Sequence, residues 1–120
     1  MESTPSYRGG KNIAMKVPPR QWQPTVHFYR NVAALPVVSD SANSVAFSFG
    51  AATLHIDLCE HLSQAEIWLE LISSDIESAK VHLEKESVTR CDEIEVLPEG
   101  FNGFWVSSPA SIVHLVSDSE

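Results

Sequence analysis

The sequence predicts an α+β domain made of two modules, each with the element order βαβββ. Alternating apolar residues predict strands and apolar residues at helical spacing predict helices, and the whole order then repeats within about fifty residues. The chain has 120 residues, of which 43% are hydrophobic, so it can bury a core without a disulfide or a structural metal. We expect one domain over 1–120, with a flexible leader at 1–10 and modules at about 11–60 and 64–117.

The first module begins with a strand over 12–17, in which Ile13, Met15 and Val17 alternate with the other residues. Pro18-Pro19 ends that strand. An apolar stripe predicts a helix from Gln23 to Ala34, limited by Pro36. On one side of this helix lie Val26, Tyr29, Arg30 and Ala33, and the apolar stripe is extended by Phe28, Val32 and Leu35. Short strands follow at 37–38, 45–49 and 53–58.

The second module begins with a strand over 66–71, where strict alternation separates an apolar face from a polar one. We expect Ile67, Leu69 and Leu71 to face the helices and Glu66, Trp68 and Glu70 to face a cleft. Ser74 and Glu77 have capping-box spacing at the start of a helix that runs to about Glu86. Its buried stripe is Ile76, Ala79, Leu83 and the aliphatic part of Lys80. Strands are expected at 90–97, 104–107 and 112–116, before a frayed acidic tail at 117–120.

Two such modules side by side predict an eight-stranded, barrel-like mixed sheet with the helices outside. The chain has 8 Lys and Arg against 16 Asp and Glu, a net charge of −8, which disfavours nucleic acid and anionic membranes as partners. No apolar run reaches the roughly 20 residues that span a bilayer, and the leader has no signal-peptide core. Cys59 and Cys91 are expected to be free thiols in a reducing cytoplasm.

Two segments are typical of one family. One is Phe28-Tyr29-Arg30-Asn31-Val32-Ala33-Ala34-Leu35-Pro36-Val37, which is similar to a helix end where Leu-Gly usually stands in place of Ala33-Ala34. The other is the turn Ser108-Pro109-Ala110, a shorter form of an Asp-Pro-Asp-Gly turn. From Lys11 to Val116 the chain resembles the vicinal-oxygen-chelate superfamily, which includes glyoxalase I, bleomycin-resistance proteins and extradiol dioxygenases. The resemblance implies a small-molecule ligand and a homodimer, which would also cover open sheet edges.

The resemblance also implies a set of metal-ligand positions, one on each of four strands. Those positions are Asn12, His55, Glu66 and His114, where the family usually has His, Glu, His and Glu. His55, Glu66 and His114 together form a two-histidine, one-carboxylate set that suits Fe and also accepts Mn, Ni, Co or Zn. Such a site would let two substrate oxygens chelate the ion, with Glu66 or Glu70 as the catalytic base.

Other interpretations of these residues stay open. Strand alternation places His55 and Asp57 on the face opposite Leu54 and Ile56, where they can form a polar wall without a metal. Trp68 and Trp105 are candidate ligand-binding aromatics, together with Asn12, Lys16 and Phe47. Phe47 can instead fill the core, Trp22 is expected to be a packing anchor, and His55, Asp57 and Cys59 form a local rival set.

Three functional hypotheses follow. The first is a metal-dependent lyase, isomerase or dioxygenase that uses His55, Glu66 and His114. The second is a metal-free binding protein that sequesters a small molecule, as bleomycin-resistance proteins do, with Trp68, Trp105, Glu66 and Glu70 in its cleft. The third is a structural dimer whose cleft has lost its function. Asn12, in place of an imidazole, favours binding or an atypical site. The chain has no P-loop, dinucleotide glycine motif, nucleophile elbow or zinc-finger spacing.

Overall fold

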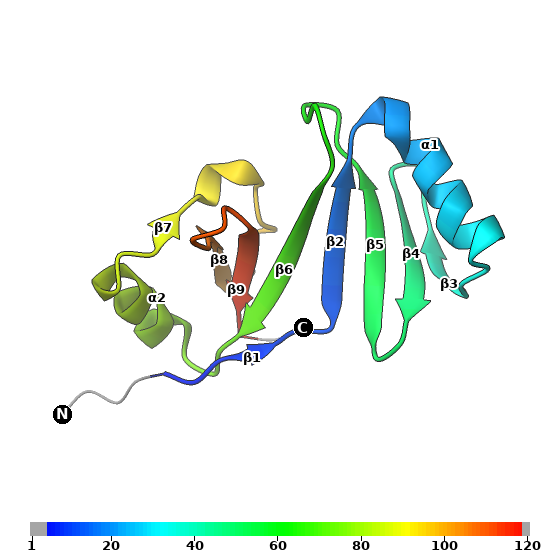
Figure 1. The fold of residues 1–120 in the computed structure, drawn as a ribbon. Helices are drawn as coiled ribbons and strands as arrows, with labels where there is room; N and C mark the ends of the chain where they lie inside the picture. The colour runs from blue at the N-terminus through cyan, green and yellow to red at the C-terminus, as the bar shows by residue number, and fades with distance from the viewer. Residues whose placement is uncertain (1–4, 119–120) are drawn as a thin grey trace. The chain divides into compact units, whose positions relative to one another are not determined.

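The computed structural model describes residues 5–118, which fall into two compact units (Figure 1). We call Lys11–Trp68 the N-unit, and residues 5–10 together with 69–118 the C-unit. Strand β6 (Glu66–Ile72) belongs to both, because Glu66–Trp68 pairs within the N-unit and Leu69–Ile72 pairs within the C-unit. Each unit is described below by itself.

The N-unit contains one helix and a mixed sheet. Its elements are β2 (Asn12–Val17), α1 (Pro19–His27), the π-helix η1 (Phe28–Val32), β3 (Val37–Asp40), β4 (Ser44–Phe49), β5 (Ala52–Leu58) and the first part of β6. The strand order is β3-β4-β5-β2-β6. Strands β2 and β5 are parallel, and all other neighbours in this order are antiparallel.

The C-unit repeats this plan. Its elements are β1 (Arg8–Gly9), the rest of β6, α2 (Ile76–Lys85), β7 (Thr89–Arg90), the 3₁₀ helix η2 (Asp92–Ile94), β8 (Gly103–Ser107) and β9 (Val113–Ser117). The order β6-β9-β8-β7 again has one parallel pair, β6 with β9, and β1 adds an antiparallel strand to β6. The predicted α+β class with two βαβββ modules is confirmed. Both strand orders are open, with β3 and β7 as edges, so neither closes into a barrel.

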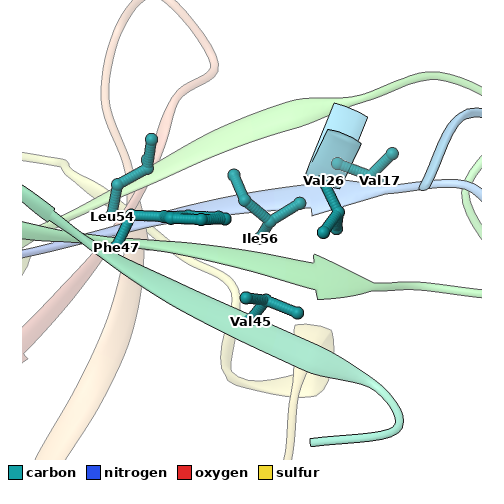
Figure 2. Close-up of a cluster of buried hydrophobic side chains, with 6 residues drawn as sticks. All are labelled: Val17, Val26, Val45, Phe47, Leu54 and Ile56. Carbon is teal, nitrogen blue, oxygen red and sulfur yellow. The ribbon is translucent and has the colours of Figure 1, made fainter. Parts of the chain in front are cut away.

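The core of the N-unit lies between its sheet and α1. Val17, Val45, Phe47, Leu54 and Ile56 come from three strands, and Val26 of α1 points toward them (Figure 2). Trp22 and Tyr29 pack against this cluster, and Trp22 Nε1 donates to the Ile56 carbonyl at 3.1 Å. Trp22 is therefore the packing anchor that the sequence predicts. The alternation of apolar and polar residues along β2 and β5 decides which face of the sheet is apolar.

The core of the C-unit lies between its sheet and α2. Ile76 and Ala79 pack with Phe104, Val106 and Val116, as the predicted stripe requires. The helix begins one residue later than the capping-box spacing predicts, because Asp75 and not Ser74 is the N-cap. The Asp75 carboxylate accepts hydrogen bonds from the Ser78 backbone N–H at 3.1 Å and from the Ser78 hydroxyl at 2.8 Å. Both bonds lower the pKa of Asp75.

The first helix differs from the prediction at both ends. It begins at Pro19 and not at Gln23, because proline is favoured in the first turn of a helix, where its missing N–H has no partner to lose. Phe28 and Val32 were expected in the buried stripe but are 50% and 66% exposed. They lie in the π-helical turn, where the Ala33 N–H donates to the Phe28 carbonyl five residues back. This wider turn rotates them away from the α-helical stripe.

Three other boundaries were wrong. Within the region 90–97 only Arg90, the last residue of β7, is strand, because the Asp92 carboxylate accepts the Trp105 N–H at 2.9 Å in place of a ladder bond. In the leader, Arg8 and Gly9 pair with Ile72 and Leu71 of β6. In the tail, Ser117 is a buried strand residue. The remaining parts of the leader and tail predictions fall on 1–4 and 119–120, outside the described residues.

Ala34 follows the π-helical turn in the left-handed region, with φ of 53°. This is the position where the resembling family usually has glycine, and only glycine adopts that region without a steric cost. Ala34→Gly is expected to raise the free energy of unfolding by about 0.5–1 kcal/mol in urea denaturation. Ala33 has φ of −79°, so Ala33→Gly is the control and is expected to lower stability. Equal losses in both variants would refute this account.

Candidate functional site

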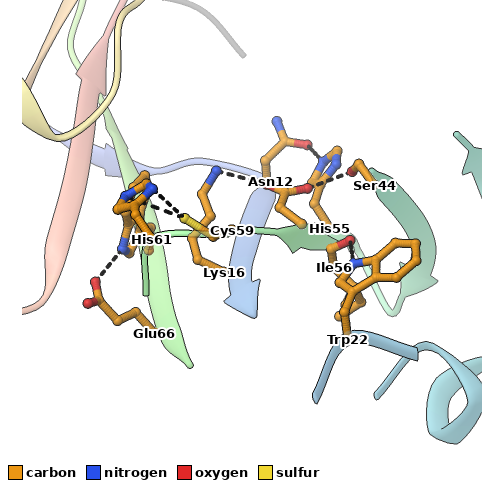
Figure 3. A network of polar contacts seen from close by, with 11 residues as sticks. Asn12, Lys16, Trp22, Ser44, His55, Ile56, Cys59, His61 and Glu66 are labelled. Carbon is orange, nitrogen blue, oxygen red and sulfur yellow. Dashed lines mark hydrogen bonds and ion pairs between the residues drawn. The ribbon is translucent and has the colours of Figure 1, made fainter. Parts of the chain in front are cut away.

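One face of the N-unit sheet is polar, and the opposite face is the core. The strand register places residues in two rows across β4, β5, β2 and β6. These rows are Ala46–His55–Ala14–Trp68 and Ser44–Asp57–Lys16–Glu66. Alternation puts both rows, and Asn12, on the face opposite Leu54 and Ile56. We call this set of residues the polar face: Asn12, Lys16, Ser44, His55, Asp57, Glu66 and Trp68. Figure 3 labels five of them, Asn12, Lys16, Ser44, His55 and Glu66.

Lys16 occupies the middle of the polar face and is only 7% exposed. Its Nζ lies 2.9 Å from Asp57 Oδ2 and 4.5 Å from the centroid of the Trp68 ring. Ser44 Oγ donates to the other Asp57 oxygen at 2.5 Å. The anionic group that Lys16 meets is thus a carboxylate of its own chain, and the indole gives it a cation–π contact. A buried ammonium requires such compensation.

Asn12 and His55 form a second contact on the polar face. His55 Nε2 and Asn12 Oδ1 are 2.8 Å apart (Figure 3). Because the amide oxygen can only accept, Nε2 carries the proton in this bond. In the neutral ring Nδ1 then holds the lone pair. Two of the positions that the resemblance marks as metal ligands are therefore bonded to each other.

Glu66 and Trp68 form the third contact. Trp68 Nε1 donates to Glu66 Oε1 at 2.8 Å, and the two residues stand two positions apart on one strand face. Trp68 is 2% exposed, whereas Glu66 is half-buried. The predicted common face of Glu66 and Trp68 is thus present. The accessible group there is the carboxylate and not the indole.

Phe47 lies on the opposite face and is fully buried in the N-unit core. Its ring centroid is 6.0 Å from that of Tyr29. Its proposed role in ligand binding is not supported, and the alternative expectation, a core residue, describes it. It faces the core because it pairs with Leu54 across β4 and β5, and paired residues share a sheet face.

The C-unit holds the other candidate residues. Trp105 is 5% exposed, and its Nε1 donates to the Glu95 carbonyl at 2.9 Å. Glu70 shares a sheet face with Trp105, and its carboxylate fills the space that a Cβ on Gly10 would need. His114 pairs with Val106, a core residue, and its Nδ1 lies 3.0 Å from the Ile112 carbonyl. His114 therefore shares the sheet face of the C-unit core.

Two of the expected metal ligands, His55 and Glu66, do not lie side by side on the N-unit sheet. His55 and Glu66 lie on strands separated by β2, about 10 Å apart, with the Lys16 ammonium on the strand between them. A metal held by both would meet that positive charge. Within residues 5–118, no cluster of at least three His, Cys, Asp and Glu side chains is arranged to hold a metal ion.

The three residues of the rival set on β5 each contact a different partner. His55 bonds to Asn12, Asp57 bonds to Lys16, and Cys59 lies 3.5 Å from the ring nitrogens of His61. Sequence reasoning missed the Lys16–Trp68 and Cys59–His61 contacts. The first depends on the register between β2 and β6, which no local pattern reveals. The second had a local signal, a Cys-Glu-His turn.

Comparison with known proteins identifies the fold. No family model and no curated protein matches the sequence. A Mn(II)-bound glyoxalase from Novosphingobium aromaticivorans matches 95% of this chain at 18% identity, with a TM-score of 0.67. Homoprotocatechuate 2,3-dioxygenase from Brevibacterium fuscum, in complex with 3,4-dihydroxyphenylacetate, matches 97% at 13% identity with a TM-score of 0.64. This chain spans 40% of the glyoxalase chain and 38% of the dioxygenase chain.

A third solved structure is of similar size. The NAD-dependent benzaldehyde dehydrogenase from Legionella pneumophila matches 88% of this chain and 96% of its own at 10% identity, with a TM-score of 0.57. At these identities the comparisons establish the fold alone. The glyoxalase and the dioxygenase are members of the vicinal-oxygen-chelate superfamily. The resemblance predicted from residues 11–116 is therefore confirmed for the fold. No helix among residues 5–118 has the length and apolar character needed to cross a membrane.

Proposed function

We propose that this chain, which has the vicinal-oxygen-chelate fold, binds a small molecule on the polar face of its N-unit without a metal ion. The observation that carries the proposal is the position of Lys16. Its ammonium lies in the middle of the polar face, paired with Asp57 and packed on Trp68. A resident cation of the chain itself therefore takes the position between Asp57 and Glu66 in one row of the polar face.

The ligand class follows from the Asn12–His55 pair. Both side chains are half-buried, so they combine fixed positions with access from solvent. Their polar atoms are 2.8 Å apart, which is comparable to the separation of oxygens on neighbouring carbon atoms. A compound with two adjacent oxygens can replace this bond, with one oxygen accepting from His55 Nε2–H and the other accepting from the Asn12 amide N–H. Glu66, held by the Trp68 indole, adds an acceptor on the same face.

The proposal predicts metal-independent binding that depends on His55 and Asn12. Isothermal titration calorimetry with a panel of catechols and vicinal dicarbonyls is expected to show binding that a chelator does not abolish. His55→Ala and Asn12→Ala are each expected to weaken affinity about tenfold, the value of one hydrogen bond to a ligand. His27→Gln, on α1, is the matched control and should leave affinity unchanged. Binding that His55→Ala leaves intact would refute the proposal.

A metal-dependent lyase, isomerase or dioxygenase is the second candidate, and the fold shared with a Mn(II)-bound glyoxalase favours it. In that case His55, Glu66 and His114 would hold Fe, Mn, Ni, Co or Zn, and Glu66 or Glu70 would be the base. Elemental mass spectrometry of the protein beside its His55→Ala variant decides between the two candidates. Stoichiometric metal that disappears in the variant would replace metal-free binding with this function.

Two finer expectations belong to the same proposal. The two cysteines are free thiols, which is compatible with a reducing cytoplasm. All four residues of the edge strand β3 are exposed, and an exposed edge favours pairing with a second copy. Trp105 and Glu70 remain candidate ligand-binding residues of the C-unit.

A further inference from the structure

A cysteine and a histidine are in contact at the end of β5, outside the polar contacts used above. Cys59 Sγ lies 3.5 Å from both Nδ1 and Nε2 of His61 (Figure 3). Cys59 is half-buried and His61 is exposed. A thiol within reach of an imidazole is the arrangement in which a base activates a sulfur nucleophile.

The backbone holds this pair in place. The Cys59 N–H donates to the Val17 carbonyl at 2.8 Å, which ties the cysteine to the end of β2. The Leu62 N–H contacts the Cys59 carbonyl at 3.4 Å, so residues 59–62 form a turn. The turn brings His61 back onto Cys59. The two side chains are therefore positioned before any reagent arrives, and little ordering is required during a reaction.

We propose that Cys59 and His61 form a nucleophilic thiol–imidazole pair that adds to α,β-unsaturated carbonyl compounds. His61 takes the thiol proton, and the thiolate sulfur forms a bond to the β-carbon of the electrophile. The double-bond electrons move onto the carbonyl as an enolate, and the imidazolium returns its proton to the α-carbon. The product is a thioether on Cys59. All atoms are retained, and no oxidant or reductant is consumed.

Cys91 provides an internal comparison. It is also half-buried, and the charged side chains that act on its thiol are Glu93, Asp92 and Arg90. Burial raises the pKa of the Cys91 thiol, and the charges of Glu93 and Asp92 raise it further. The thiolate is the reactive form, so these effects disfavour reaction at Cys91. The two thiols thus have similar exposure but different neighbours, an imidazole beside Cys59 and two carboxylates near Cys91.

The test is alkylation of the folded full-length chain by N-ethylmaleimide, an α,β-unsaturated imide, followed by peptide-resolved mass spectrometry. An ordinary thiol is only a few per cent ionised at neutral pH, so Cys59 is expected to react at least about tenfold faster than Cys91. In urea, where the pair is separated, the two rates should converge. Equal rates in the folded protein would overturn the proposal.

The variant His61→Gln distinguishes activation of the Cys59 thiol by the imidazole from simple exposure of that thiol. It is expected to slow the alkylation of Cys59 about tenfold. It is also expected to remove the ultraviolet thiolate absorbance, which Cys59→Ser removes as well. His27→Gln, the same change at another exposed histidine of the N-unit, should leave rate and absorbance unchanged. Circular dichroism confirms that each variant is folded. If Cys59 keeps its rate in folded His61→Gln, the fast reaction reflects access alone and the pair is not a nucleophilic site.

Discussion

Phe47→Ala is expected to lower the free energy of unfolding by about 3–5 kcal/mol, the usual cost of truncating a buried aromatic ring. Phe47 is fully buried, pairs with Leu54 across β4 and β5, and lies beside Tyr29. Alanine would leave a cavity at the centre of the N-unit core that its neighbours can fill only in part. Urea denaturation followed by circular dichroism measures the loss.

Phe49→Ala is the matched control, because Phe49 lies two residues further along the same strand but is 45% exposed. Its cost is expected to stay below about 1 kcal/mol. Phe47→Leu adds a functional readout, since it keeps an apolar side chain on the core face. Its ligand affinity should equal that of the wild type. A fall in affinity with unchanged stability would show that Phe47 lines the ligand site after all.

This pair of residues shows what the sequence can and cannot reveal about the fold. Alternation places Phe47 and Phe49 on one face, and that part of the prediction follows from the geometry of any strand. Their different burial depends on where α1 and η1 cover the sheet. The sequence pattern did not locate that cover, because the helix begins at a proline and ends in a π-helical turn.

The candidate site was likewise predictable only in part. The residue types and their faces were predictable, since His55, Asp57, Lys16 and Glu66 all lie on the polar face. Their contacts were not, because these depend on the register between strands far apart in sequence. The parallel pairing of β2 with β5 sets Lys16 opposite Asp57 and Asn12 close to His55. A one-residue shift in that register would reverse the face of one strand and remove both contacts.

Lys16→Met is the second substitution with a large expected effect. It keeps the apolar part of the side chain and removes the charge that neutralises Asp57. Removing one partner of a buried ion pair lowers the free energy of unfolding by about 3–5 kcal/mol. Because the Asp57 side chain is 23% exposed, we expect a smaller loss for Lys16→Met, of about 2–3 kcal/mol. Urea denaturation of Lys16→Met, Asp57→Asn and the double variant measures the coupling. The double variant is expected to lose less than the two single losses combined.

Arg30→Met is the control, because Arg30 forms an ion pair with Asp40 at the surface of the same unit. That pair is exposed, so its loss is expected to cost less than about 1 kcal/mol. Equal losses in Arg30→Met and Lys16→Met would mean that the buried charge of Lys16 has no special role.

The same variant tests why the polar face binds no metal in our proposal. Without the Lys16 ammonium, the Asp57 and Glu66 carboxylates on either side of it lose their resident cation. Added Mn²⁺ is then expected to raise the melting temperature of Lys16→Met while leaving that of the wild type unchanged, because a ligand stabilises only the folded form that binds it. If Mn²⁺ instead stabilises the wild type to the same extent, Lys16 does not occupy the position of the cation, and the metal-dependent function becomes the better account of this face.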